Sequence, residues 1–182
     1  MITKLGVPSI NAAGDMAFTV GYKSPTGAVS AVCKVKDFQL TTRTATMRVQ
    51  TGQPLPGAGV VDERMLPADA TFAAFLDPVL GSDGSILVLA TIKGTGVTDA
   101  NNKVLLFGGV RVEPGEFSVV ARTGHAMAAL GGAKIKACKS TETCGNGCVA
   151  FTATLGRSSR ATASRCSSRT RIRGTRRHSS GR

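Results

Sequence analysis

Three closely spaced cysteines are the residues of this sequence whose type best suits metal chemistry. Cys138, Cys144 and Cys148 follow one another with five and then three residues between them. Thiolates bind zinc well, but structural zinc sites usually join cysteines about two to four residues apart to a second such pair or to histidines. Here the fourth ligand would have to be His125 or Cys166. The spacing therefore favours free cysteines, or one disulfide if the protein is exported.

The stretch "TDANN" (98–102) carries oxygen ligands of the kind that calcium prefers. Asp99, Asn101 and Asn102 lie close together, but calcium takes about six to eight oxygen ligands. The stretch also lacks the glycine and the distal glutamate of an EF-hand. We therefore expect a loop between two strands, in which the Asp and Asn side chains hydrogen-bond to nearby backbone.

His125 is a residue that could act as a general base, which requires a nucleophile within hydrogen-bond reach. The sequence contains no Gly-x-Ser-x-Gly nucleophile elbow, and Gln53 stands at the matching place after an earlier Thr-Gly pair. Gly-rich pieces such as "GTGVTD" lack the lysine and the helix of a phosphate-binding loop. We therefore predict no catalytic, cofactor-binding or metal-binding residues, and a protein that is not an enzyme.

The segments that must position these residues recur along the chain. Three stretches place a glycine turn before an apolar run, namely "INAAGDMAFTV", "GSDGSILVLAT" and "TCGNGCVAFTAT", with glycines at Gly14, Gly84 and Gly147. Two other stretches place Thr-Gly after a strand that contains an arginine, at Thr51 and Thr123. The steps between matching positions are 70, 63 and 72 residues. Similar steps between the glycine turns and between the Thr-Gly pairs indicate a repeated unit.

Each unit is predicted to contain about four strands. Val, Ile, Phe and Thr suit a pleated, half-buried surface, and they dominate runs that Gly, Pro, Asn and Asp separate. The runs are 16–22, 28–36, 44–50, 85–93, 103–112, 116–122 and 148–155. A strand before the turn is expected at 72–80, and a weaker one at 133–141. The sequence thus predicts an all-β fold of antiparallel four-stranded blade-like repeats, a partial β-propeller of about two blades.

Arg48 and Arg122 stand at matching places in the two strands before Thr-Gly. Such an arginine could pair with Asp15 or Asp77 between two blades, or it could face solvent. Solvent exposure is the default expectation, because a surface ion pair contributes only about 0–1 kcal/mol.

The order of these motifs resembles that of bacterial β-propeller-like repeat proteins, most of them exported and uncharacterised. The resemblance rests on "PSINAAGDMAFTV", "FLDPVLGSDGSILVLATIKGTGVTDANNKVLLF", "VVARTGHA" and "VAFTATLG", and it covers about 7–156. The chain departs from the pattern at Phe107, where many copies have Trp, and at the three clustered cysteines. The resemblance implies an extracellular or cell-envelope location and no catalytic residues.

We place the repeats in 1–156, with units at about 7–57 and 58–124 and a partial unit at 125–156. About four to eight blades close a propeller, so two units leave sheet edges that invite association. The expected function is a non-enzymatic scaffold or binding surface for a protein or a glycan, with neighbouring blades or self-association.

The sequence has no stretch of about 20 apolar residues that could span a membrane, and no signal peptide.

The formal net charge of +12 is concentrated at the end of the 182-residue chain. Residues 157–182 hold nine Arg and no Asp or Glu, which leaves a net charge of +3 in 1–156. Ile172 is the only large aliphatic residue of this tail, so the tail is predicted to be disordered. A change of reading frame is favoured, because the break interrupts a repeat. The alternative is a nucleic-acid-binding protein that uses 157–182 as a basic arm on phosphate backbones.

Overall fold

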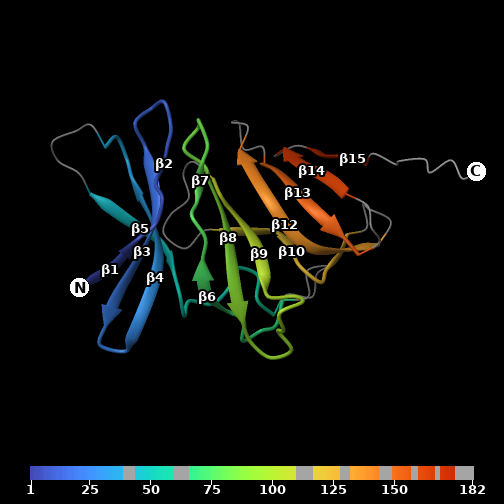
Figure 1. The fold of residues 1–182 in the computed structure, drawn as a ribbon, viewed down its shortest axis with the longest axis horizontal. Coiled ribbons are helices and arrows are strands. Elements are labelled where there is room, and N and C mark those ends of the chain that lie inside the picture. Colours follow the sequence, from blue (N-terminus) through green and yellow to red (C-terminus); the bar gives the residue numbers. More distant parts are fainter. Residues whose placement is uncertain are drawn as a thin grey trace, which may run out of the picture.

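The described elements of the protein, in a computed structural model, are all β-strands. The structure describes residues 1–38, 44–59, 66–109, 117–127, 132–143, 149–156, 160–166 and 169–174. The strands form three antiparallel sheets that stand side by side, from the N-terminal sheet at the left of Figure 1 to the third sheet at its right. This arrangement confirms the predicted all-β fold of antiparallel, four-stranded, blade-like units.

The first sheet is a meander of four strands with a short fifth strand attached. Its order is β1 (Ile2–Leu5), β3 (Met16–Ser24), β4 (Gly27–Val35) and β5 (Ala45–Gln50). The short strand β2 (Ser9–Ile10) pairs with β3 ahead of the glycine turn. The predicted strands at 16–22, 28–36 and 44–50 are therefore confirmed, whereas β1 was missed.

The second sheet repeats this plan. Its order is β6 (Thr71–Phe75), β8 (Ile86–Lys93), β9 (Lys103–Gly108) and β10 (Ser118–Arg122), and β7 (Val79–Leu80) pairs with β8. Ile2 lies opposite Tyr22 in the first sheet, as Phe72 lies opposite Ile92 in the second. Corresponding residues of these strands are thus 70 positions apart, and the first unit includes residues ahead of the predicted start at residue 7.

The third sheet begins in the predicted partial unit and continues into the tail. Its order is β11 (Ala126–Met127), β12 (Ala133–Thr143), β13 (Val149–Leu155), β14 (Arg160–Cys166) and β15 (Arg169–Gly174). Within the tail for which the sequence predicted disorder, from residue 157 on, the structure pairs the backbones of β14 and β15 alongside β13. Backbone pairing with a free strand edge requires no apolar side chains. The rest of 157–182 lies outside the described residues.

The hydrophobic core has one layer between each pair of neighbouring sheets, and a smaller cluster of Val20, Ala31 and Cys33 lies on the first sheet. Along β8, Ile86 and Val88 pack toward the first sheet, whereas Leu87 packs toward the third. Side chains of a strand alternate between its two faces, so a strand covered on both faces must be apolar at successive positions. This explains the unbroken apolar run at 86–90, in which every residue but one is buried.

Candidate interaction surface

The recurring glycine turn has the same geometry in the first two units. Gly14 has a φ of 79° and Gly84 a φ of 82°, in the left-handed region that favours glycine. The Gly14 amide donates to the carbonyl of Asn11 at 3.1 Å, and the Gly84 amide donates to that of Gly81 at 2.9 Å. The third turn, around Gly147, lies outside the described residues.

The first turn and its strands hold the second turn by hydrogen bonds. The Asn11 amide Nδ2 donates to the carbonyl of Gly81 at 3.0 Å, and Ser9 Oγ accepts from the Leu80 amide at 3.0 Å. Lys34 Nζ donates to the carbonyl of Gly84 at 2.8 Å. We call Ser9, Asn11 and Lys34 the latch. All three latch residues bind backbone atoms of the second unit, so its side chains do not determine these contacts.

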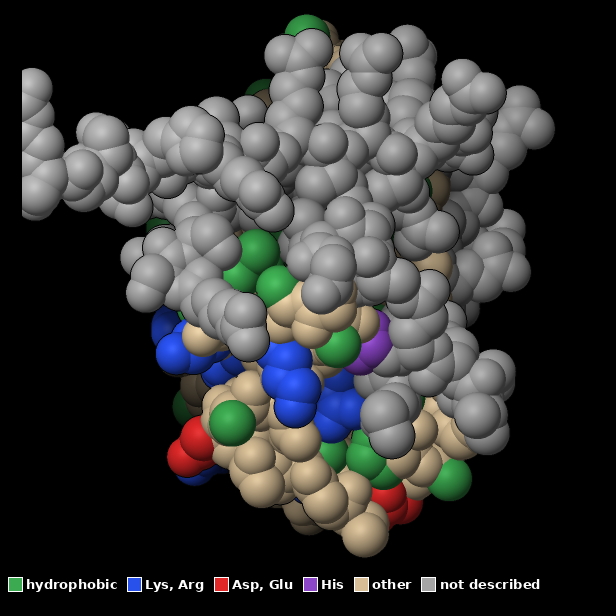
Figure 2. All heavy atoms as spheres, turned by 90° about the vertical axis from the view of Figure 1, so that its right-hand side faces the viewer, with side chains coloured by type: hydrophobic (Ala, Val, Ile, Leu, Met, Phe, Trp, Pro, Cys, Tyr) green, Lys and Arg blue, Asp and Glu red, His purple; other side chains and the backbone are tan. Residues whose placement is uncertain are grey.

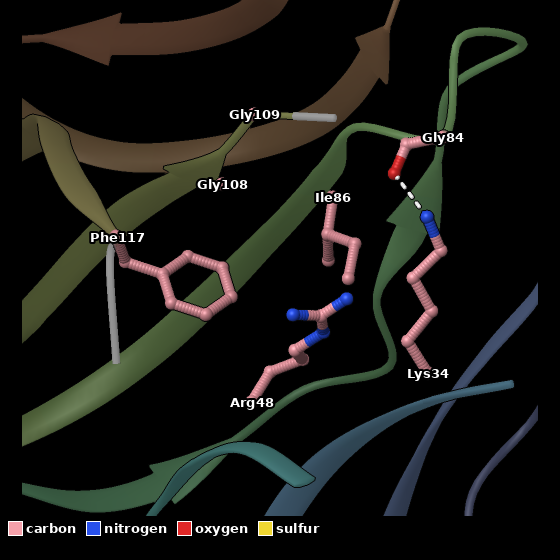
Figure 3. A pocket seen from close by; sticks show the side chains of 7 residues that line it. All are labelled: Lys34, Arg48, Gly84, Ile86, Gly108, Gly109 and Phe117. Atoms are coloured by element: carbon pink, nitrogen blue, oxygen red, sulfur yellow. Dashed lines mark hydrogen bonds between the residues drawn. The ribbon is translucent and has the colours of Figure 1, made fainter. Parts of the chain in front are cut away.

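A buried ion pair completes the latch. Lys34 Nζ lies 3.0 Å from Asp15 Oδ2, and the two side chains are 8% and 13% exposed. A Cβ at Gly84 would stand 2.8 Å from Lys34 Nζ, so a larger residue would displace the end of this lysine, and the φ of 82° favours glycine as well. In Figure 3, Lys34 points to the Gly84 carbonyl, and the Arg48 guanidinium lies between Lys34 and the ring of Phe117. The cavity that these residues line measures about 10 Å³, about the space of one water molecule.

The recurring Thr-Gly pair forms a second joint between units. The Gly52 amide donates to the carbonyl of Phe72 at 2.8 Å, and the Gly124 amide donates to that of Ile135 at 2.7 Å. The next carbonyl, that of Gln53 in the first joint, accepts from the Phe72 amide at 3.0 Å. In the second joint the carbonyl of His125 accepts from the Ile135 amide at 2.9 Å. His125 therefore occupies the place of Gln53, as predicted, and its backbone links two sheets.

The second interface replaces the latch with apolar residues. The pairing registers place Phe107 where the first sheet has Lys34, and Val79 where it has Ser9. Both side chains are partly buried against the core between the second and third sheets. The two interfaces thus share one strand plan but differ in polarity. Hydrophobic packing is present at both interfaces, and among the described residues the latch contacts belong to the first.

The first sheet has an apolar side that faces away from the second sheet, which we call the open face. In the described part of the chain, no further sheet lies on this side (Figure 1). It forms a hollow of about 500 Å³. The lining residues are Ile2, Leu5, Gly6, Pro8, Met16, Phe18, Val20, Tyr22, Cys33 and Ala45. None of them is charged, because alternation along β3 and β4 turns Lys23 and Lys34 to the opposite side.

The other end of the molecule differs in character. Figure 2 views the end formed by the third sheet, where the described side chains include a group of Lys and Arg and only small, separated hydrophobic areas. Acidic side chains lie toward the lower edge of this view. The described side chains in this view thus include basic residues, whereas the side chains that line the open face are uncharged.

The predicted "TDANN" loop connects β8 and β9, and its side chains bind within the loop. Asn101 Oδ1 accepts from the Thr98 amide at 2.7 Å, and Asn101 Nδ2 donates to the carbonyl of Gly96 at 3.2 Å. Asn102 Nδ2 donates to Asp99 Oδ1 at 3.1 Å. These contacts confirm the predicted loop between two strands with local Asp and Asn hydrogen bonds.

Asp69 and Thr95 form a link at the base of this loop that the sequence analysis missed. The Thr95 amide lies 3.0 and 2.9 Å from the two Asp69 carboxylate oxygens, and Thr95 Oγ1 donates to Oδ2 at 2.8 Å. These hydrogen bonds, chiefly that of the Thr95 hydroxyl, lower the pKa of the Asp69 carboxyl. No sequence motif marks the pair, since its members are 26 residues apart.

The described cysteines are not placed for metal binding. Cys33 and Cys138 are both free, and burial raises the pKa of the Cys33 thiol and raises that of Cys138 to about 11. Cys144 and Cys148 lie outside the described residues, and of Cys166 only the backbone is described. Over the described residues, no group of three or more His, Cys, Asp or Glu side chains could hold a metal ion.

The predicted correspondence of Arg48 with Arg122 is wrong. Cys33 lies opposite Met47 in the first sheet, as Leu106 lies opposite Val119 in the second. Gln50 therefore holds the place of Arg122, and Arg48 holds that of the residue after Val119. Arg122 is also buried instead of exposed. Its Nε donates to the carbonyl of Asn101 at 2.9 Å, and burial lowers the pKa of its guanidinium.

The aspartates proposed as partners of these arginines serve the first interface instead. Asp15 pairs with Lys34, and Asp77 Oδ1 accepts from Thr19 Oγ1 at 2.8 Å. No local sequence signal marks the Thr19–Asp77 contact, because its members are 58 residues apart.

The fold and this surface define the class: an all-β protein of stacked four-stranded antiparallel sheets whose units are joined through recurring turns. The chain belongs to a family of unknown function, DUF7453, whose model matches residues 1–165. No curated protein and no solved structure matches the chain. Within the described residues, no helix has the length and apolar character needed to cross a membrane.

Proposed function

We propose that the chain is a non-enzymatic β-propeller-like repeat module that provides a scaffold or binding surface in an exported bacterial protein. The observation that carries the proposal is the use made of its polar side chains. Asn11 and Lys34 hold the second unit, and Asn101 and Asp69 hold a loop. Side chains of the types that could perform chemistry are thus engaged in joining the parts of the structure.

The two hollows described above also favour a surface over a reaction. The cavity beside Lys34 has room for about one water molecule, which is too small for a substrate. The larger hollow on the open face is lined by uncharged residues, and its one thiol, Cys33, has a raised pKa because of burial. A protonated thiol is a weak nucleophile, so this hollow is suited to binding apolar groups.

The test combines a binding assay with an activity screen on the full chain. Immobilised protein is exposed to arrayed bacterial glycans and envelope proteins, and in parallel it is assayed with ester, phosphoester, glycoside and peptide substrates. We expect saturable binding in the first assay and no turnover in the second. Turnover that disappears when Cys33 is replaced by Ser would contradict the proposal. Salt-sensitive DNA binding that is lost on deleting 157–182 would favour the alternative of a basic nucleic-acid-binding arm.

A further inference from the structure

We infer that the open face of the first sheet is the docking site for one further four-stranded sheet of the same repeat type. That sheet would present Ser, Asn and Lys at the places of Ser9, Asn11 and Lys34. The inference deepens the proposed scaffold function, because it assigns one partner to one surface. It rests on the continuity of the open face with the two interfaces already present in the chain.

The same face of each unit is the one that receives the preceding unit. In the second sheet, Ile86 and Val88 face the first sheet and are 4% and 1% exposed. In the third sheet, Phe151 faces the second sheet and is 4% exposed. Their counterparts in the first sheet are Met16 and Phe18, both on the open face. The open face thus corresponds to a surface that is covered in the other two units.

The outer strands of the first sheet carry apolar side chains that are exposed, whereas their counterparts in the second sheet are buried. Ile2 is 62% exposed, whereas Phe72, which holds its place in the second sheet, is 1% exposed. Met47 is 43% exposed, whereas Val119 at the corresponding place is 1% exposed. Burying apolar surface stabilises by about 25 cal/mol per Å², so a sheet that covers these residues gains free energy.

The polar contacts that fasten an arriving sheet are available as well. In the first interface, the latch binds the Leu80 amide and the carbonyls of Gly81 and Gly84. The corresponding backbone groups of the first sheet belong to Ile10, Asn11 and Gly14. A backbone group is present whatever the side chain. The Gly14 carbonyl already accepts from the Phe38 amide at 2.7 Å, so an arriving lysine would use its second lone pair.

A complete second copy of this chain does not fit as the occupant. Ala17, Val32 and Lys34, the residues that would dock, are already covered by the copy's own second sheet. The occupant is therefore a repeat sheet whose latch-bearing face is still free.

The experiment supplies such a sheet from the chain itself. Residues 1–70 are fused ahead of the full chain, which preserves the register because residue 71 corresponds to residue 1. Tyr22 is the only Tyr of the chain, and Trp is absent. Replacing Tyr22 with Phe in the added unit alone leaves one Tyr, on the receiving face. Acrylamide quenching of its fluorescence then reports whether that face is covered.

We expect quenching of Tyr22 to fall several-fold in the fusion relative to the parent chain. We also expect far-UV circular dichroism to show added β-structure. The matched control carries Asn11→Ala and Lys34→Met in the added unit only, and its quenching should return toward that of the parent.

Unchanged quenching in a folded fusion overturns the inference. An added unit that stays unfolded also overturns it, since docking should fold that unit as it does in the parent. The proposed scaffold function is judged separately, by the binding and turnover assays on the parent chain.

Discussion

Replacing Lys34 with methionine tests whether the latch stabilises the first interface. The substitution keeps most of the side-chain volume but removes the ion pair with Asp15 and the hydrogen bond to the Gly84 carbonyl. Asp15 would be left as a mostly buried carboxylate without its cation, since it is only 13% exposed. Removing one partner of a buried ion pair typically costs about 3–5 kcal/mol.

The expected loss follows from this burial. Because both side chains keep some exposure, we take the low end of that range, about 3 kcal/mol in the free energy of unfolding. In a domain of about 150–250 residues, each kcal/mol shifts the melting temperature by about 2–4 °C, so Lys34→Met should lower it by about 6–12 °C. Urea unfolding followed by far-UV circular dichroism measures the loss directly.

A double-mutant cycle identifies the source of that loss. Asp15→Asn in the Lys34→Met background should restore part of the stability, with a coupling energy of about 1–3 kcal/mol. Phe107→Met is the matched control, because Phe107 holds the place of Lys34 at the second interface without an ion pair. A conservative apolar exchange of this kind usually costs less than about 1.5 kcal/mol. A loss below about 0.5 kcal/mol for Lys34→Met, or strictly additive changes in the cycle, would refute the reasoning.

Three further predictions concern other parts of the chain. In urea unfolding, Met47→Ser should lower the free energy of unfolding by less than about 1 kcal/mol, whereas Val119→Ser at the corresponding buried place should lower it by about 2–4 kcal/mol. Equal losses of stability would contradict the exposure of the open face. The pKa of Asp69 is lowered, so its contribution to folding stability is present above its ordinary pKa of 3.8 and is lost as the pH falls through the folded value. Carboxyl NMR titration should show that Thr95→Val raises the pKa of Asp69 toward 3.8. An unchanged pKa would contradict the link between Asp69 and Thr95. In a variant that keeps Cys138 as its only cysteine, alkylation at pH 8 should be roughly 100-fold slower than for a free thiol, because the pKa of Cys138 is about 11. An alkylation rate like that of glutathione would contradict the burial of this thiol.

The sequence predicted those parts of the fold that depend on local information. The runs at 86–93 and 149–155 are rich in β-branched and aromatic residues, and glycines mark the turns before them. β1 was missed because "ITKL" is short and contains a lysine, and it becomes a strand only by pairing with β3. Its identity as a strand is set by its neighbours and not by its own composition.

The latch depends on contacts between residues that are far apart in the chain, and the sequence does not reveal such contacts. Lys34 reads as an ordinary polar residue of an alternating strand, and nothing local indicates that it reaches a carbonyl 50 residues away. The error over Arg48 and Arg122 has a definite cause. Both strands contain an irregularity in their pairing, and alignment on the arginines ignores the register that the strands share.

The latch binds main-chain atoms of the second unit, and this affects how the sequences of the two units can change in evolution. Ser9, Asn11 and Lys34 recognise only an amide and two carbonyls, which every amino acid except proline supplies at those positions. Mutations that alter the recipient's side chains, apart from the constrained glycine at Gly84, leave this attachment intact. For these three contacts, selection therefore acts mostly on the unit that carries the latch. On the receiving unit, it acts on the apolar side chains that face the first sheet and on Asp77.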